Sequence, residues 1–366
     1  MGNRESTVEG MVIDTAFWTG KRVLVTGHTG FKGAWLSLWL TEMGAVVSGY
    51  ALDPPTTPNL FTHLRLDKRV ASVIGDLRDP AHVRRAVAEH RPDVVFHLAA
   101  QPLVRESYRD PVGTYATNVM GLVHLFEALR ETATARVMVN VTSDKCYENR
   151  EWVWGYRETD AMGGYDPYSS SKGCAELVTA AYRRSFFQDG GMTLASARAG
   201  NVIGGGDWAD DRLVPDAIRA FGAARPLRIR NPHAVRPWQH VLDPLNGYMM
   251  LARRLWDDPG CAEGWNFGPP AEDARNVAWV VDRLCSAWGE GAAWERDGDD
   301  HPHEASLLSL DCAKARNGLG WHPVWHTEQA LEETIRWYRA ASDGESMVDF
   351  SLQQITRFST QAASAA

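Results

Sequence analysis

The chain has 366 residues, of which 38 are Lys or Arg and 46 are Asp or Glu, so its formal net charge is −8. Hydrophobic residues make up 44% and charged residues 23%, a composition typical of a globular protein and not of a disordered one. The acidic balance argues against a protein that holds a nucleic acid polymer through a basic surface. A domain-size prior of about 150 residues predicts two domains, or one large domain with a lobe.

The sequence indicates neither a membrane span nor a secretory leader. The densest apolar runs, such as residues 94–100, have the length of a strand and fall short of the ~18 residues that a span needs. The first sixteen residues are mixed polar and contain no long apolar core. The five cysteines are scattered without a CxxC pair, which predicts no metal site and no disulfide framework. We therefore expect a cytoplasmic protein.

Short β-branched runs alternate with helical stretches from Arg22 onward. The expected strands comprise residues 22–26, 45–52, 72–75, 93–99, 136–142 and 194–199. The expected helices comprise residues 30–43, 83–90, 110–130 and 168–187, the third beginning at Asp110-Pro111. This alternation predicts an α/β fold with a Rossmann-type doubly wound parallel sheet that helices cover on both faces.

The regular alternation ends near Asn201. Consecutive glycines, prolines and clustered arginines then predict long loops, with helices returning at residues 276–288 and 328–341. We expect a Rossmann body over residues 17–200, to which about 235–262 return. The rest, mainly 201–350, forms a smaller interleaved C-terminal lobe. Residues 1–16 and the Ser/Gln/Ala-rich 351–366 are expected as tails, the latter frayed.

Three glycines lie directly after the first expected strand and open the first helix. Gly27 allows a tight turn, Gly30 lets a pyrophosphate approach the backbone, and Gly33 lets the helix pack on the strand. The phosphates are expected at the helix N-terminus, where N–H groups and the helix dipole favour an anion. In this strand–turn–helix context, a dinucleotide-binding loop is favoured over a merely tight turn.

Other strand ends complete the expected cofactor site. Asp53, after the second strand, is near the position that binds the adenosine ribose, and the lack of an adjacent arginine favours NAD over NADP. Asp76 and Leu77 are expected at the adenine, and residues 97–101 along the ribose and diphosphate. The full set of predicted NAD-binding residues is Gly27, Thr29, Gly30, Phe31, Lys32, Gly33, Asp53, Asp76, Leu77, Leu98, Ala99, Ala100, Gln101, Asn118, Tyr168 and Lys172.

A candidate catalytic pair lies on one face of a helix, because Tyr168 and Lys172 are at positions i and i+4. A nearby ammonium and an oxidised nicotinamide both favour phenolate, so we expect the tyrosine pKa to fall from about 10 toward neutrality. The phenol then acts as a base. Ser143 supplies a hydroxyl at the end of the preceding strand. The competing interpretation is an exposed helix pair beside a solvated charge run.

Asp144 and Lys145 add two titratable groups beside that hydroxyl, which indicates more than hydride transfer. A nucleotide-sugar 4,6-dehydratase needs such a pair. Oxidation at C4 acidifies the C5 proton, and the C6 hydroxyl must leave. One group takes the C5 proton while the other protonates the leaving oxygen.

These motifs resemble the extended short-chain dehydrogenase/reductase family and, within it, the CDP-glucose branch of the nucleotide-sugar 4,6-dehydratases. The likeness runs from about Phe17 to Tyr338. It rests on residues 25–40, 97–108, 115–121, 141–158, 163–176, 198–216 and 230–241. The resemblance implies a hydro-lyase that converts CDP-glucose to CDP-4-dehydro-6-deoxyglucose and water with bound NAD. Such products feed deoxysugar biosynthesis, including that of lipopolysaccharide.

The resemblance also implies individual roles. Tyr168 oxidises C4, Lys172 holds the cofactor ribose and tunes Tyr168, and Ser143 hydrogen-bonds the C4 oxygen. Asp144 is the acid for C6. Lys145 stands where the dTDP-glucose and GDP-mannose relatives carry glutamate. As a base at C5 it must first be neutral, and a charged Lys145 that stabilises the C5 anion is the competing role.

A basic stretch indicates the substrate pocket. Residues 212–236 contain six arginines and one acid, a local balance of 6 − 1 = +5, and guanidinium groups suit a pyrophosphate. Arg212 and Arg236 match the family's diphosphate ligands, whereas Arg219 and Arg225 also fit a solvated surface. Trp208 and Trp238 are candidate lining residues. The predicted substrate-binding residues are Asn201, Arg212, Leu213, Arg228, Arg230, Arg236 and Gln239.

Two other function classes remain open at this stage. A nucleotide-sugar epimerase or decarboxylase shares Tyr168 and Lys172 but has no use for Asp144 and Lys145. A dinucleotide-binding regulator without catalysis has no need for an intact Ser143, Tyr168 and Lys172. The resemblance further implies a homodimer or homotetramer paired through helices 111–130 and 168–187. We expect no nucleic acid or membrane partner and no metal.

Overall fold

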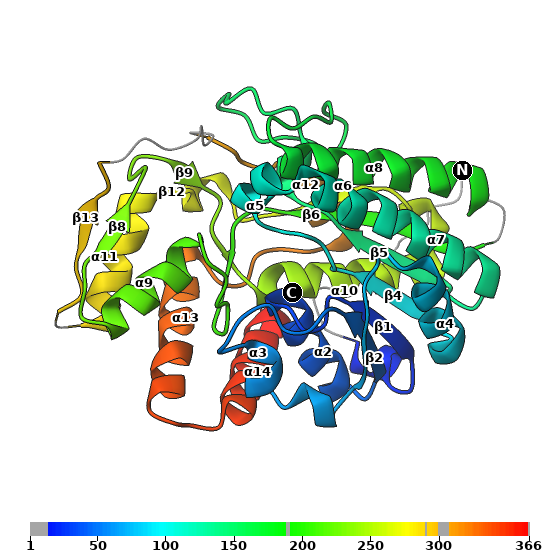
Figure 1. The fold of residues 1–366 in the computed structure, drawn as a ribbon, viewed down its shortest axis with the longest axis horizontal. Coiled ribbons are helices and arrows are strands. Elements are labelled where there is room, and N and C mark those ends of the chain that lie inside the picture. The colour runs from blue at the N-terminus through cyan, green and yellow to red at the C-terminus, as the bar shows by residue number, and fades with distance from the viewer. Residues whose placement is uncertain (1–13, 188–190, 290, 299–306, 365–366) are drawn as a thin grey trace.

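The computed structural model describes residues 14–187, 191–289, 291–298 and 307–364. Within these residues, seven strands form one sheet in which all neighbours are parallel, in the order β11-β6-β5-β4-β1-β2-β3 (Figure 1). The strands are β1 (Arg22–Thr26), β2 (Val46–Ala51), β3 (Ala71–Ile74), β4 (Val94–His97), β5 (Val137–Val141), β6 (Thr193–Ala199) and β11 (Gly264–Phe267). The predicted doubly wound sheet is confirmed, and β11 is a strand that the sequence pattern missed.

The strand order reverses direction at β1. The chain runs outward from β1 through β2 to β3, then crosses back to β4 on the other side of β1. Val25 of β1 is therefore flanked by Gly49 on one side and Phe96 on the other. Open α/β sheets bind their ligands outside the carboxyl ends of the strands at such a switch point.

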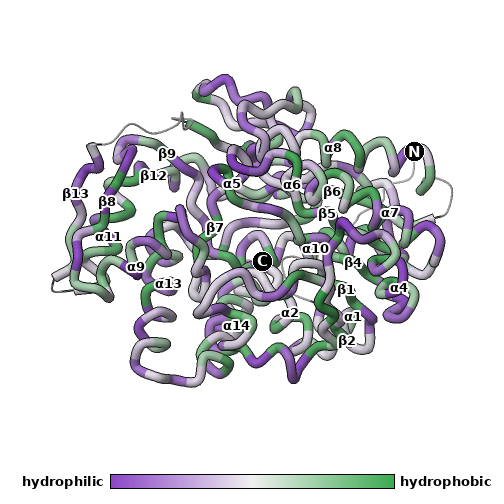
Figure 2. The backbone as a smooth tube through the Cα atoms, in the orientation of Figure 1, coloured by the Kyte–Doolittle hydropathy of each residue, from purple (hydrophilic) through white to green (hydrophobic). Residues whose placement is uncertain are grey.

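Alternate residues of β1, β4, β5 and β6 enter two different cores. Val23 and Val25 of β1 lie in the larger core, and Leu24 lies in the smaller one. Helices α2 (Phe31–Glu42) and α10 (Leu242–Asp257) pack in the larger core. The other face is covered by α4 (Pro80–His90), α7 (Gly121–Thr132) and α8 (Pro167–Phe186). Along α4, hydrophobic and hydrophilic residues alternate, as expected of a helix with one solvent-facing side (Figure 2).

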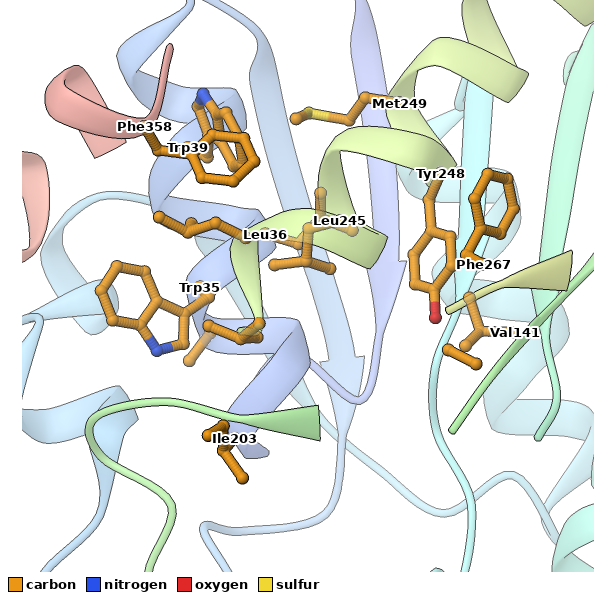
Figure 3. Close-up of a cluster of buried hydrophobic side chains, with 14 of the residues drawn as sticks. Trp35, Leu36, Trp39, Val141, Ile203, Leu245, Tyr248, Met249, Phe267 and Phe358 are labelled. Carbon is orange, nitrogen blue, oxygen red and sulfur yellow. The ribbon is translucent and has the colours of Figure 1, made fainter. Parts of the chain in front are cut away.

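The middle of helix α2 is enclosed by the rest of the molecule on all sides. Its residues from Gly33 to Leu40 are all buried. Leu36 faces Leu245 of α10, whereas Trp39 meets Phe358 of α14 (Met347–Ser364), with ring centroids 5.6 Å apart (Figure 3). The prediction of a frayed tail at 351–366 is therefore wrong for its described part. Ile355, Phe358 and Ala362 recur at helical spacing within that polar segment and are buried.

Side-chain caps fix where two helices of the catalytic side begin. Asp110 accepts a hydrogen bond from the Gly113 N–H, so α6 (Pro111–Tyr115) begins at the predicted Asp-Pro pair. A π-helical turn (Ala116–Met120) joins α6 to α7. Asp166 caps α8 in the same way, accepting from the Ser169 N–H at 2.9 Å, with Pro167 as the first helical residue. This cap puts Tyr168 in the first turn of α8.

The C-terminal half builds a lobe beside the sheet, at the left of Figure 1. Its paired strands are short, with β8 parallel to β13, β9 antiparallel to β12, and β7 parallel to β10. The strands are β7 (Val202–Ile203), β8 (Leu227–Ile229), β9 (Val235–Arg236), β10 (Gln239–His240), β12 (Arg275–Asn276) and β13 (Trp294–Arg296). The helices of this half, besides α10 and α14, are α9 (Leu213–Gly222), α11 (Val277–Trp288), α12 (Ala313–Leu319) and α13 (Thr327–Ser342). Helix α10 packs on β5 and β6, and β11 pairs with β6; the expected domain boundaries stay a prediction.

The remaining helices are short: α1 (Thr15–Trp18), α3 (Leu60–His63) and α5 (Val104–Arg109). Residues 15 and 16, expected in a tail, belong to α1, and the rest of that tail up to residue 13 lies outside the described residues. No helix in the described residues is both long enough and apolar enough to cross a membrane.

Candidate active site

A cavity of about 1330 Å³ opens at the carboxyl ends of the central strands. The phosphate loop, the segments that follow β4, β5 and β6, and the arginine-rich part of the lobe all line it. Residues that are distant in the sequence, such as Gly30, Ser143, Tyr168 and Arg236, therefore face one space. The position agrees with the switch point of the sheet.

The phosphate loop is held too tightly for side chains at two of its glycines. Gly27 has φ +77°, and a Cβ there would lie 2.7 Å from the Ala99 nitrogen. A Cβ on Gly33 would lie 2.1 Å from the Gly27 carbonyl oxygen. A Cβ on Gly30 would meet no atom closer than 3.4 Å, and this residue precedes α2 without a side-chain cap. The first N–H groups of α2 thus face the cavity ready for an anion, which fits the pyrophosphate of a dinucleotide.

The predicted adenosine contacts also line the cavity. Asp53 is exposed just beyond β2, and Leu77 lies beyond β3. Arg78 hydrogen-bonds the Asp76 carboxylate at 2.6 Å and thereby holds the pKa of that carboxyl below its usual value. Asp76 is therefore an anionic acceptor at this end of the cavity.

Two residues predicted at the cofactor, Gln101 and Asn118, form hydrogen bonds that hold the loop after β4. Gln101 donates to the Leu103 carbonyl and to Thr114 Oγ1, and it does not line the cavity. Asn118 donates to the Gln101 carbonyl at 3.1 Å and to Ser171 Oγ at 2.9 Å, and it is also outside the lining. Both amides thus tie the loop after β4 to neighbouring helices, and their contact with NAD stays a prediction. The other fourteen predicted NAD-binding residues line the cavity.

Tyr168 and Lys172 lie on the cavity side of α8 and are both buried. Burial raises the pKa of Tyr168 to about 12, against the lowering effect of a hydrogen bond with Ser143. Burial also lowers the pKa of Lys172 to about 8. The near-neutral phenol expected from the sequence is therefore not produced by the chain's own groups, because desolvation outweighs the nearby positive charge.

The residues after β5 form a hydrogen-bonded acid. Ser143 Oγ donates to Asp144 Oδ1 at 3.0 Å and accepts from the Lys145 N–H at 3.2 Å. Only 4% of Asp144 is exposed, and burial raises the pKa of its carboxyl although the Lys145 charge opposes this. A carboxyl with a raised pKa stays protonated to a higher pH, so it has a proton available for a leaving oxygen. Lys145 itself is half-buried and lines the same cavity.

A buried ion pair anchors the catalytic helix one turn beyond Lys172. Glu176 accepts hydrogen bonds from Thr142 Oγ1, Ser196 Oγ and Arg198 Nη2, at 2.5, 2.6 and 2.7 Å respectively. These bonds fix α8 to the ends of β5 and β6. The sequence offers one signal for Glu176, its spacing of four residues from Lys172.

The side chain of Lys32 was expected at the cofactor, but it also extends toward the catalytic residues. Its Nζ donates to the Tyr248 hydroxyl at 3.4 Å. Burial and the positive charge of Arg212 lower the pKa of Lys32 to about 7, and Asp144 opposes this shift. The only sequence signal for this position is a charged residue between two glycines of the loop.

The lobe supplies the arginines of the cavity. Asn201, Leu213 and four of the arginines predicted at the substrate line it, namely Arg212, Arg228, Arg230 and Arg236. Trp208 and Trp238 line it as well, whereas Arg219 and Arg225 do not. Gln239 lies outside the lining, where its Nε2 donates to the Phe267 carbonyl at 2.9 Å, and its contact with the substrate stays a prediction. Across the described residues, no three His, Cys, Asp or Glu side chains are grouped to hold a metal ion.

The family model for GDP-mannose 4,6 dehydratase matches residues 24–334, which span both the sheet and most of the lobe. The chain belongs to this dehydratase family. Within it, the chain is 56% identical over 353 residues to the CDP-glucose 4,6-dehydratase of Salmonella typhimurium, covering 95% of this chain and 98% of that one.

Solved structures of this dehydratase fold show the same architecture. A UDP-glucose 4-epimerase from Thermotoga maritima, solved with UDP-glucose, superposes with a TM-score of 0.77 at 22% identity and covers 87% of this chain and 99% of that one. A dTDP-glucose 4,6-dehydratase from Streptomyces venezuelae, solved with NAD, has a TM-score of 0.75 at 22% identity and covers 88% and 98%. At this identity the likeness establishes the fold alone.

Proposed function

We propose that this dehydratase acts on CDP-glucose, forming CDP-4-dehydro-6-deoxyglucose and water. The observation that carries the proposal is the meeting of Ser143, Asp144 and Lys145 with Tyr168 and Lys172 in the cavity that begins at the phosphate loop. The high identity to a CDP-glucose 4,6-dehydratase supports the choice of sugar nucleotide. The reaction oxidises C4, eliminates water across C5 and C6, and reduces C6.

NAD fits the cavity through the free N–H groups of α2 and through Asp53 and Asp76 at its far end. Bound NAD would supply the hydride acceptor for C4 and the hydride donor for C6, together with the positive charge of its oxidised ring. Lys172 adds a second positive charge one helical turn from Tyr168 and is positioned to hold the cofactor ribose. These two charges oppose the desolvation that raises the tyrosine pKa.

The chain's own groups then move protons at named atoms. Tyr168 takes the proton of the C4 hydroxyl, and Ser143 hydrogen-bonds the same oxygen. Asp144 gives its proton to O6 as the C6–O6 bond breaks and water leaves. The buried position of Asp144 supports this role, because it keeps the carboxyl protonated to a higher pH than in water.

We assign Lys145 to the step in which C5 loses its proton. It either accepts the C5 proton as a neutral amine or, as an ammonium, stabilises the anion that the proton leaves behind. The variant Lys145→Ala separates these roles in an exchange experiment in deuterated water. Loss of C5 exchange with C4 oxidation retained supports the base, whereas unimpaired exchange rejects it.

The substrate diphosphate is assigned to the arginines of the lobe. Arg212 is oriented by Asp207 at 2.8 Å, and Arg236 follows on β9. One guanidinium group can donate two parallel hydrogen bonds to the oxygens of a phosphate, so two arginines match a diphosphate. Asn201, which follows β6, lines the same cavity.

An epimerase of the same fold is the alternative, and the buried acid argues against it. Epimerisation needs a base and a cofactor but no proton donor at C6. Burial raises the pKa of Asp144, which favours a proton donor, and a proton donor is needed when a hydroxyl leaves. An epimerase would return an isomer of unchanged mass.

The experiment is to incubate the purified protein with CDP-, dTDP-, UDP- and GDP-hexoses and to follow the mass of each. The expected result is loss of one water from CDP-glucose in preference to the others. Deuterium at C4 should reappear at C6 of the product. No dehydration of CDP-glucose would overturn the proposal, and deuterium in the solvent would contradict internal return.

We further propose a homo-oligomer formed through the helices on the α8 side of the sheet. These helices carry large apolar side chains that are exposed in the single chain, namely Val112, Met120, Leu177 and Phe186. Sedimentation at equilibrium tests this, and a monomer throughout the concentration range would reject it. The cytoplasmic location stays a prediction.

A further inference from the structure

The following inference rests on the proposed reaction. That reaction leaves Tyr168 and Asp144 in protonation states that differ from those at its start. Tyr168 gains the proton of the C4 hydroxyl, and Asp144 loses a proton to O6 as water leaves. C5 gives up one proton and regains one when C6 is reduced. At the end of a turnover, Tyr168 therefore holds one proton too many and Asp144 one too few, while the exchange with solvent sums to zero.

Ser143 stands between these two groups. Its Oγ donates to Asp144 Oδ1 at 3.0 Å and also shares a hydrogen bond with Tyr168. A serine hydroxyl has one hydrogen and two acceptor lone pairs. It can donate to the carboxylate while it accepts from the phenol, which is the arrangement that a proton passing from Tyr168 to Asp144 requires.

Asp144 exposes little of its surface. The residue is 4% exposed, and its Oδ2 is buried with no hydrogen-bond partner among the described residues. A Cβ on Gly200 would lie 3.1 Å from that oxygen, so the backbone closes this side. Oδ1 is the oxygen that Ser143 already contacts, so the side-chain hydrogen bond of the carboxyl leads to Ser143.

We propose that Ser143 is a proton relay that returns the proton from Tyr168 to Asp144 at the end of each turnover. The phenol O–H bond breaks as the serine oxygen accepts its proton, and the serine hydrogen passes to Asp144 Oδ1. Rotation of the hydroxyl then restores the starting arrangement. No electron is exchanged and no proton leaves the site, so one hydroxyl closes the circuit between the base and the acid.

The surroundings of the two groups act on the transfer in different ways. Burial favours the protonated form of Asp144, whereas the positive charges of Lys145, Arg236 and Lys32 favour its carboxylate. Arg212 favours the phenolate of Tyr168. A positive charge beside the phenol favours the phenolate. The reset therefore belongs to the end of the turnover, when the dinucleotide is again oxidised and positively charged.

The test compares the first turnover with later ones. The NAD-loaded protein is mixed with excess CDP-glucose, quenched at intervals and assayed for dehydrated product by mass spectrometry. Wild type and Ser143→Thr, which keeps the hydroxyl, are expected to form product linearly from the start. Ser143→Ala is expected to give a burst of one product per active site, followed by turnovers about 10²-fold slower, because the acid must then recover its proton from solvent.

A second measurement separates the relay from slow product release and from a positioning role at C4. Added imidazole, a small proton carrier, is expected to accelerate the later turnovers of Ser143→Ala and to leave its first turnover unchanged. A linear time course in an active Ser143→Ala protein, or a burst that imidazole does not relieve, would overturn the relay alone. Absence of product from wild type would overturn the proposed function and the relay with it.

Discussion

The sheet and the lobe contribute to the cavity in different ways. The sheet presents backbone: the N–H groups of α2, the ends of β4 and β5, and glycines where a Cβ would collide with main-chain atoms. The lobe presents long side chains from short paired strands and loops, chiefly Arg212, Arg228 and Arg236. We infer that the sheet sets the geometry of the chemistry and that the lobe mainly sets affinity. Four variants test this division, from the largest expected effect to the smallest.

Tyr168→Phe removes the proposed base on the sheet side and keeps the ring. We expect kcat for dehydration of CDP-glucose to fall by about 10²–10⁴-fold, because proton transfer by a positioned group contributes that much. The affinity for CDP, measured by calorimetry, should stay within a factor of about two, since the ring keeps its packing. A large loss of CDP affinity with kcat retained would reverse the division.

Phe358→Ala tests whether the sheet and the lobe are joined into one structure through α14. The ring is fully buried against Trp39 and Trp325, so its removal should lower the free energy of unfolding by about 3–5 kcal/mol. Denaturant unfolding measures this. Gln353→Ala, at an exposed position of the same helix, is the control and should change stability by less than about 0.5 kcal/mol. Equal effects in the two variants would show that α14 does not brace α2.

Gly33→Ala tests the claim that backbone contact shapes the phosphate loop. The new Cβ would lie 2.1 Å from the Gly27 carbonyl oxygen, so the loop must shift. The expected cost is about 1–3 kcal/mol of stability, together with weaker NAD retention. Gly222→Ala is the matched control, because a Cβ there meets nothing within 4 Å. NAD titration and thermal unfolding measure the two effects, and unchanged NAD binding in Gly33→Ala would count against the loop's role.

Arg236→Ala removes one guanidinium group from the lobe side of the cavity. A hydrogen bond to a charged group contributes about 1.5–3 kcal/mol, so the Kd for CDP should rise by about 10–100-fold. Arg225→Ala, outside the cavity lining, should leave the Kd unchanged. Calorimetry at two salt concentrations would measure both. A similar weakening by the two variants would indicate a general charge effect instead of a diphosphate contact.

The features that could be predicted from the sequence are those that depend on local geometry. The spacing of Gly27, Gly30 and Gly33 predicts a loop, and the i, i+4 pair of Tyr168 and Lys172 predicts a shared face; the structure has both. The segment after β5 was likewise identified from residue type and position. Each of these depends on a short stretch of chain whose backbone conformation follows from its own residues.

The features that could not be predicted depend on contacts between distant segments. The side-chain amides of Gln101, Asn118 and Gln239 hydrogen-bond backbone and hydroxyl groups that only the folded chain brings near. The pKa of Tyr168 rises because burial, which periodicity does not measure, outweighs the nearby charges. The helix α14 was not predicted because its few apolar residues are separated by many polar ones in the sequence.

The packing of α14 on α2 has a consequence for biosynthesis. The ribosome delivers α2 long before α14, so the indole ring of Trp39 lacks its Phe358 partner until α14 has been made. Throughout that interval the nascent chain exposes an apolar helix that its own sheet does not fully cover. Such surfaces are where aggregation begins and where chaperones bind. The packing of α2 is therefore completed only when α14 docks on it.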